Sequence, residues 1–293
     1  MRIEQEPSSD LRPPAYWPTT GNLVVDGLSA RYTMDGPTIL KNISFRIKSG
    51  EHISVVGRTG SGKSSLVLSL LRCIPTEGEV FYDGVSTSKI ALDSLRSNIT
   101  IIPQVPDLLS GTLRQNLDPF SAYDDATLND ALRSAGLFSL QEEPSTSFGA
   151  ADEGENIPRL ALDTVLTNAG GNLSVGQRQI IALARAMLTK DKLLILDEAT
   201  SAIDHKTDAL IQANLRTEFA DTTVIAIAHR LKTIIDFDKV MVLEEGQIVE
   251  FDTPESLLQK SEGKLRALVD ESPDRALLFA MVERRGKFTT EDT

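Results

Sequence analysis

A glycine-rich loop that ends in lysine and serine is the part of this sequence best suited to chemistry. The loop has the pattern G-x-x-x-x-G-K-[ST], as Gly57-Arg58-Thr59-Gly60-Ser61-Gly62-Lys63-Ser64. It follows a short apolar run, 52–56, and precedes a helical pattern, 64–72. Glycines let backbone N–H groups approach a polyphosphate, lysine supplies positive charge to the β- and γ-phosphates, and the serine hydroxyl can ligate Mg²⁺. The pattern predicts a phosphate site for a nucleoside triphosphate.

Two acidic residues close another apolar run. Asp197 and Glu198 follow Leu193–Leu196 directly, which is typical of a buried strand. Consecutive residues at a strand end point to opposite sides, so one carboxylate can face the metal while the other faces an attacking water. We therefore predict Asp197 as a magnesium ligand and Glu198 as the general base or water-positioning residue.

Two further polar residues are weaker candidates when taken singly. Gln104 follows Ile101-Ile102-Pro103, and its amide could reach the metal or the water. His229 follows the apolar run 223–228. A lone histidine after a strand is more often structural than catalytic. Gln104 and His229 become credible site residues only in combination with the other motifs of the chain.

These motifs together resemble the nucleotide-binding domain of ABC (ATP-binding cassette) proteins. The segment Leu173-Ser174-Val175-Gly176-Gln177 is similar to the family signature, usually Leu-Ser-Gly-Gly-Gln, and the match extends over about residues 22–260. The resemblance implies that Tyr32 stacks on adenine, that Gln104 belongs to the Q-loop, that Asp204 belongs to the D-loop and that His229 contacts the γ-phosphate. It also implies that ATP and Mg²⁺ are the cofactors.

The expected site residues fall into three groups. The ATP-binding residues are Tyr32, Gly57, Arg58, Thr59, Gly60, Ser61, Gly62, Lys63, Ser64, Ser65, Ser174, Val175, Gly176, Gln177 and Asp204. The metal ligands are Ser64, Gln104 and Asp197, and the catalytic residues are Glu198, His229 and Gln104.

Three local features narrow the resemblance to one subfamily. The chain is similar here to the second nucleotide-binding domain of subfamily C, the multidrug-resistance-associated transporters. The three features are the segments Pro14–Pro18 and Asn116–Phe120, and Val175 in place of glycine. This implies an ATP-hydrolysing C-terminal part of a longer exporter, with a second nucleotide-binding domain and transmembrane domains as partners. In such a head-to-tail pair each ATP lies between one domain's loop and the other's signature. Because valine keeps the N–H but adds a β-branched side chain, we expect a weaker site opposite this signature.

Charge and composition favour this interpretation over its rivals. The chain of 293 residues has 30 basic and 42 acidic residues, a net charge of −12, which argues against binding nucleic acid. The alternative, a non-transport ABC ATPase acting on the ribosome or DNA, is also disfavoured because no sustained heptads separate loop and signature. A module that holds ATP without hydrolysing it is not required, since the candidate catalytic residues are all present. The single cysteine, Cys73, is expected in the core.

The patterns predict an α/β fold: a P-loop NTPase core with a parallel sheet, an N-terminal antiparallel β subdomain and an inserted α-helical subdomain. Helical patterns cover 124–137 and 177–188, and a hairpin signal lies at 244–246. We expect a linker at 1–21, the ATP-binding domain at 22–262 with its helical subdomain at about 106–188, and a helical tail at 263–293. No apolar run reaches the ~18 residues that span a bilayer. We therefore expect a soluble chain at the cytosolic face of a membrane, held there only by its partner domains.

Overall fold

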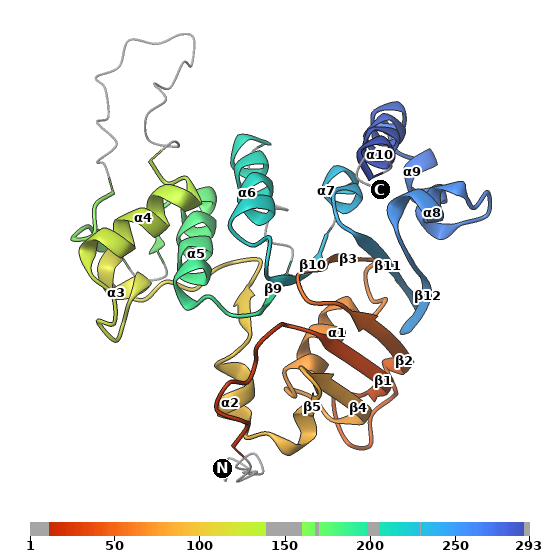
Figure 1. Cartoon of the computed structure of the whole chain (residues 1–293), viewed down its shortest axis with the longest axis horizontal. Coiled ribbons are helices and arrows are strands. Elements are labelled where there is room, and N and C mark those ends of the chain that lie inside the picture. Colours follow the sequence, from red (N-terminus) through yellow and green to blue (C-terminus); the bar gives the residue numbers. More distant parts are fainter. Residues whose placement is uncertain (1–11, 139–159, 168–169, 198–204, 229, 290–293) are drawn as a thin grey trace. The chain divides into compact units, whose positions relative to one another are not determined.

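The computed structural model describes residues 12–138, 160–167, 170–197, 205–228 and 230–289, except for the side chains of 205, 206 and 284–289. By its internal contacts the chain divides into two compact units. Unit 1 draws on residues 1–101, 191–201 and 221–293, and unit 2 on residues 102–190 and 202–220. In Figure 1, unit 2 contains the helices labelled α3 to α6.

Unit 1 begins with an antiparallel sheet in which buried and exposed side chains alternate. In its second strand the buried Ile43, Phe45 and Ile47 alternate with the exposed Ser44 and Arg46. Such alternation is typical of a strand with one face buried and the other exposed. The strand order is β2-β1-β4-β5, with β1 (Leu23–Ala30), β2 (Leu40–Ile47), β4 (Thr76–Tyr82) and β5 (Val85–Ser86).

A second sheet is built from short apolar strands. Its order is β12-β11-β3-β10-β9-β6, with β3 (His52–Val56), β6 (Thr100–Ile102), β9 (Leu193–Asp197), β10 (Thr223–Ile227), β11 (Lys239–Glu244) and β12 (Gln247–Asp252). Strands β11, β3, β10 and β9 pair in parallel, and β12 is an antiparallel edge strand. Strands covered on both faces need apolar side chains at successive positions, which explains the runs at 193–196 and 224–227. The predicted α/β class with a parallel core sheet is confirmed.

Helices complete the described part of unit 1. They are α1 (Lys63–Leu70), the 3₁₀ turn η1 (Thr87–Lys89), α2 (Leu92–Arg96), α7 (Leu231–Ile235), α8 (Pro254–Gln259), α9 (Lys264–Asp270) and α10 (Arg275–Thr289). The predicted terminal helical region is therefore two helices, because Pro273 has no N–H with which to continue α9. The prediction for Cys73 was wrong: α1 has ended, Arg72 has a φ of 53°, and the cysteine is exposed.

The six-stranded sheet of unit 1 contributes to two hydrophobic cores. Met241 and Leu243 of β11 pack with the buried residues of the antiparallel sheet. The alternate residues Val240 and Val242 pack with apolar residues of α7 to α10. Figure 1 shows these helices on the side of β11 away from β1 and β2. The C-terminal helices are thus part of the packed core of unit 1. Among the described residues, no helix is both long enough and apolar enough to cross a membrane.

Unit 2 is mainly helical. Its elements are β7 (Gly111–Thr112), α3 (Leu113–Leu117), α4 (Asp125–Ala135), β8 (Val165–Leu166), α5 (Val175–Thr189) and α6 (His205–Thr217). Helix α4 begins after the capping residue Asp124 and ends at Gly136, which has a φ of 92°. Helices α4, α5 and α6 pack on one another, and Asn214 Nδ2 donates to the Ala135 carbonyl at 3.1 Å. The predicted helical lobe, 106–188, did not include α6.

The segment that leads into β1 is bound to the turn between β4 and β5. Trp17 Nε1 donates to the Tyr82 carbonyl at 2.7 Å, and the two rings meet edge-on with centroids 5.1 Å apart. The Asp83 carboxylate accepts hydrogen bonds of 2.5–3.2 Å from the amides of Thr19, Thr20, Gly21 and Asn22 and from the Thr20 hydroxyl. We call these contacts the entry clamp. They fix residues 17–22, most of which were expected to be linker, onto unit 1.

The entry clamp predicts a pH dependence of stability. Partial burial raises the pKa of Asp83, but the hydrogen bonds from Thr20, Gly21 and Asn22 outweigh this and hold the pKa below its ordinary value. A lowered folded-state pKa gives stability that is present above pH ~4 and is lost as the pH falls through the folded-state pKa. Asp83→Asn should therefore destabilise the chain by about 1–2 kcal/mol near neutral pH. That difference should shrink below pH ~4.

Urea unfolding of the parent chain and Asp83→Asn at pH 7 and at pH 3 measures this difference. Asparagine tolerates the positive φ of 47° at this position, so the substitution tests mainly the charge. Asp35→Asn, at an exposed carboxylate in the loop after β1, is the matched control. A penalty for Asp83→Asn that is equal at both pH values would contradict the assignment.

Candidate functional site

The glycine-rich loop connects β3 to α1 in a conformation that needs its glycines. Gly60 and Gly62 have φ values of 82° and 108°, in the left-handed region that side chains disfavour. Gly62 precedes the first turn of α1 without capping it through a side chain. The first N–H groups of an α-helix have no partner within the helix, and the helix dipole is positive at that end. The loop therefore ends at a helix start of the kind that suits an anion, and the predicted phosphate site requires this geometry.

The Lys63 side chain folds back onto the glycine-rich loop and binds its backbone. Its Nζ donates to the carbonyls of Gly57 at 2.9 Å and Arg58 at 3.2 Å, and the residue is only 7% exposed. The ammonium group thus lies beside the backbone of the loop whose N–H groups would face a phosphate. A positive charge held in this position can stabilise the β- and γ-phosphates of a nucleotide.

A cavity of about 290 Å³ joins this loop to an aromatic residue far away in the sequence. Tyr32, on the irregular segment after β1, lines the cavity with its ring half exposed. The remaining lining residues are Ile39, Thr59, Gly60, Gly62, Lys63, Ser64 and Ser65. Residues from these two parts of unit 1, expected to serve the two ends of one nucleotide, therefore line the same cavity.

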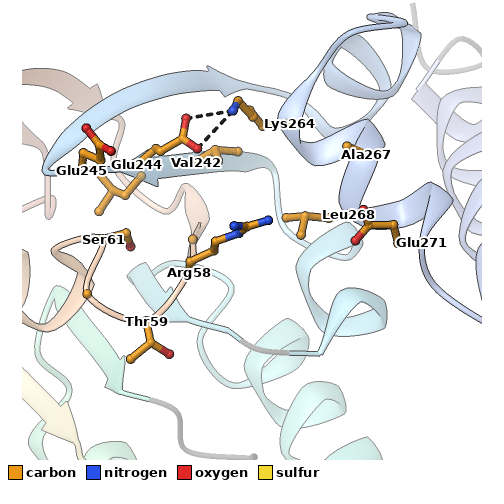
Figure 2. A pocket seen from close by; sticks show the side chains of 13 residues that line it. Arg58, Thr59, Ser61, Val242, Glu244, Glu245, Lys264, Ala267, Leu268 and Glu271 are labelled. Atoms are coloured by element: carbon orange, nitrogen blue, oxygen red, sulfur yellow. Dashed lines mark hydrogen bonds and ion pairs between the residues drawn. The ribbon is translucent and has the colours of Figure 1, made fainter.

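A larger cavity of about 430 Å³ lies on the other side of the loop, toward β11 and α9. Figure 2 shows Arg58 extending into it toward Leu268 and Glu271. Lys264 closes part of its wall by pairing with the Glu244 carboxylate at 3.0 Å. The predicted ATP-binding residues Tyr32, Lys63 and Ser64 line the smaller cavity and do not line the larger one.

The turn between β11 and β12 is hydrogen-bonded to the glycine-rich loop. The Gly246 N–H donates to the Ser61 carbonyl at 3.0 Å, and the Gly246 carbonyl accepts from the Lys41 N–H at 2.8 Å. Gly246 has a φ of 78°, and a Cβ built there would lie 1.8 Å from the Ile39 carbonyl oxygen. The sequence predicted this turn as a hairpin only. Its role in holding the loop was missed, and no local pattern signals it.

Asp197 lies at the same edge of the sheet as the loop. It pairs with Ile227 of β10, which in turn pairs with Val55 of β3. Adjacent strands are about 4.8 Å apart, so Asp197 is about 10 Å from Val55, just before the loop begins. The exposed Ser64 hydroxyl and the Asp197 carboxylate are the oxygen ligands that Mg²⁺ prefers. These residues of unit 1 fit a magnesium site.

The signature segment, in unit 2, forms the start of a long helix. Ser174 caps α5: its hydroxyl accepts from the Gln177 N–H at 3.1 Å, and Gln177 Oε1 accepts from the Ser174 N–H at 2.9 Å. Gly176 lies against α6, since a Cβ there would be 3.3 Å from Thr207. Ser174 is exposed and Val175 is half-buried, so the helix start is accessible beside both.

The segment from Gln104 onward in unit 2, which was predicted to contain the Q-loop, is held by two residues that the sequence analysis missed. The buried Gln179 donates through Nε2 to the carbonyl of Gln104 at 2.7 Å, while the Gln104 side chain is exposed. Arg185 donates to the carbonyls of Asn116 at 2.5 Å and Asp107 at 3.0 Å. A signal existed for Gln179, because it is a polar residue on the apolar face of α5. Three predicted residues, Glu198, Asp204 and His229, lie outside the described residues.

Comparison with known proteins agrees with this geometry. A family model described as ABC transporter matches residues 40–201, more than half of the chain. The chain is 43% identical to human ATP-binding cassette sub-family C member 4 over 276 residues, covering 94% of this chain and 19% of that protein. It is 47% identical to sub-family C member 2 of Rattus norvegicus over 251 residues, covering 85% and 15%. A pleiotropic ABC efflux transporter of multiple drugs from Candida glabrata is 39% identical over 292 residues, covering 97% and 18%. The chain thus spans about a fifth or less of the length of these relatives.

Proposed function

Because the chain belongs to the ABC transporter family, whose ATPase domains bind and hydrolyse ATP, we propose that it is the ATPase part of a subfamily C exporter. The observation that carries this proposal is the cavity that Tyr32 lines together with Lys63 and Ser64. An aromatic ring offers stacking area for a base, while the helix start and the lysine offer charge for phosphates. The efflux function of the relative from Candida glabrata supports export as the work that is driven.

The chemical roles follow from the residue types. Ser64 and Asp197 of unit 1 would hold Mg²⁺, which when bound neutralises charge on the β- and γ-phosphates. Glu198 would hold the attacking water and accept its proton, and His229 would contact the γ-phosphate. Lys63 compensates phosphate charge throughout the reaction.

We further propose a second nucleotide-binding domain and transmembrane domains as partners. The start of α5 supports the first, because its N–H groups beside Ser174 and Val175 suit the γ-phosphate of a nucleotide bound by that partner domain. Asp204, in the D-loop, would belong to the same shared interface. The β-branched side chain of Val175 crowds this approach, so the nucleotide site opposite this signature would be the weaker of the two.

Lys63→Ala should weaken MgATP binding by about a hundredfold or more, the range expected when charge-assisted hydrogen bonds to a phosphate are lost. Titration calorimetry on the purified chain of 293 residues measures this. Lys41→Ala, at an exposed lysine of β2, is the matched control and should bind as the parent does. A thermal melt shows whether the Lys63 variant is folded. Equal affinities of a folded Lys63→Ala and the parent would refute the proposed site.

A further inference from the structure

The Tyr32 side chain must be held in one orientation if its ring is to line the nucleotide cavity in a fixed position. The residue lies on the irregular segment between β1 and β2 and is 53% exposed. An exposed side chain on such a segment is free to change rotamer, and fixing it costs conformational entropy at the moment of binding. Stacking on a base requires the face of the ring to stay in one orientation.

Ser65 supplies a rigid partner for this ring. The Tyr32 hydroxyl and Ser65 Oγ are 3.0 Å apart and share a hydrogen bond. Ser65 is the third residue of α1 and is only 4% exposed. Its backbone is fixed in turn, because the Ser69 hydroxyl donates to the Ser65 carbonyl at 2.7 Å.

The two neighbouring serines are therefore suited to different tasks. Ser64 is exposed at the loop, where its hydroxyl can reach a metal ion or a phosphate. The Ser65 side chain is buried, and the contact of its hydroxyl is with the phenol of Tyr32.

We propose that Ser65 is a positioning residue: its hydroxyl holds the Tyr32 ring at a fixed distance from the phosphate loop. This one hydrogen bond then fixes the distance between the end of the cavity that binds the base and the end that binds the phosphates. This inference rests on the proposed function, since it assigns how the aromatic wall of that same nucleotide site is oriented. It predicts that the two side chains act on nucleotide affinity as one unit.

A double-mutant cycle tests this with MgATP calorimetry on the parent chain, Tyr32→Phe, Ser65→Ala and the double variant. Tyr32→Phe keeps the ring and removes only its hydroxyl. Each single variant should bind about fivefold more weakly, the scale of one neutral hydrogen bond. The double variant should bind no more weakly than either single one, because all three lack the same bond. Ser97→Ala, at an exposed serine after α2, is the control and should bind within about twofold of the parent, less than half a kcal/mol.

Inorganic tripolyphosphate, which has no base, separates positioning from a direct phosphate contact. Ser65→Ala should leave its affinity within about twofold of the parent, since the ring has nothing to stack on. An equal loss for tripolyphosphate and ATP would overturn the inference, as would a double variant weakened by the product of the two single effects. If the parent chain binds neither ligand, the proposed function itself fails and this inference fails with it.

Discussion

Glu198→Gln is expected to slow ATP hydrolysis by about 10²–10⁴-fold, the usual contribution of a positioned base. Glutamine has nearly the same shape as glutamate but cannot accept a proton from the attacking water. ATP binding should persist, because the loop, Lys63 and Tyr32 are unchanged. If the nucleotide joins two nucleotide-binding domains, as proposed above, a variant that no longer cleaves it should also remain paired for longer in MgATP.

Single-turnover hydrolysis of labelled ATP, with light scattering to follow pairing, measures both effects in the purified chain. Glu262→Gln makes the same substitution at an exposed glutamate before α9 and should behave as the parent does. Turnover of the Glu198 variant within a factor of two of the parent would mean that another group positions the water.

Gly246→Ala is expected to destabilise unit 1 by about 3–5 kcal/mol, as overpacking against backbone and a strained φ combine. The new Cβ would lie 1.8 Å from the Ile39 carbonyl oxygen, a backbone atom that has no rotamer with which to move aside. Any shift of the turn also breaks the hydrogen bond from Gly246 to Ser61, so MgATP affinity should fall in the molecules that remain folded.

Gly84→Ala is the matched control for this variant. Gly84 also has a positive φ, 75°, but a Cβ there would meet nothing within 4 Å. It should cost only the roughly 1 kcal/mol of an alanine in the left-handed region. Urea unfolding of both variants separates conformational strain from steric conflict. Equal penalties for the two would show that the contact with Ile39 relaxes freely and that the turn does not constrain the loop.

The sequence predicted best those features that depend on residues close together in the chain. The runs at 193–196 and 224–227 are apolar because they are covered on both faces, so they could be predicted as buried strands without knowing their neighbours. The phosphate loop could be predicted because its glycines and lysine are adjacent in the chain. Helix α4 was predicted from Asp124 to Leu137 and found at Asp125–Ala135, with Asp124 and Gly136 acting as its two caps.

What could not be predicted depends on residues that meet only after folding. Tyr32 reaches Ser65 across 33 positions, and the Asp83 carboxylate binds amides about 60 positions away. Nothing near Gly246 in the sequence shows that Ile39 packs on it. Helix α6 was missed for a different reason: polar Thr207 and Asn214 share its buried side with Ile211 and Leu215, so its apolar period is weak.

The entry clamp also places the single tryptophan where its fluorescence reports on the docking of residues 17–22. Trp17 is the only tryptophan in the sequence, and in the folded chain its indole lies against Tyr82 with its N–H bound to a carbonyl. Intrinsic tryptophan emission therefore comes from this one junction, whereas far-ultraviolet circular dichroism averages over all helices and strands. Release of residues 17–22 from an otherwise intact fold would change the emission and leave the dichroism unchanged. The two signals together distinguish local undocking of this segment from global unfolding.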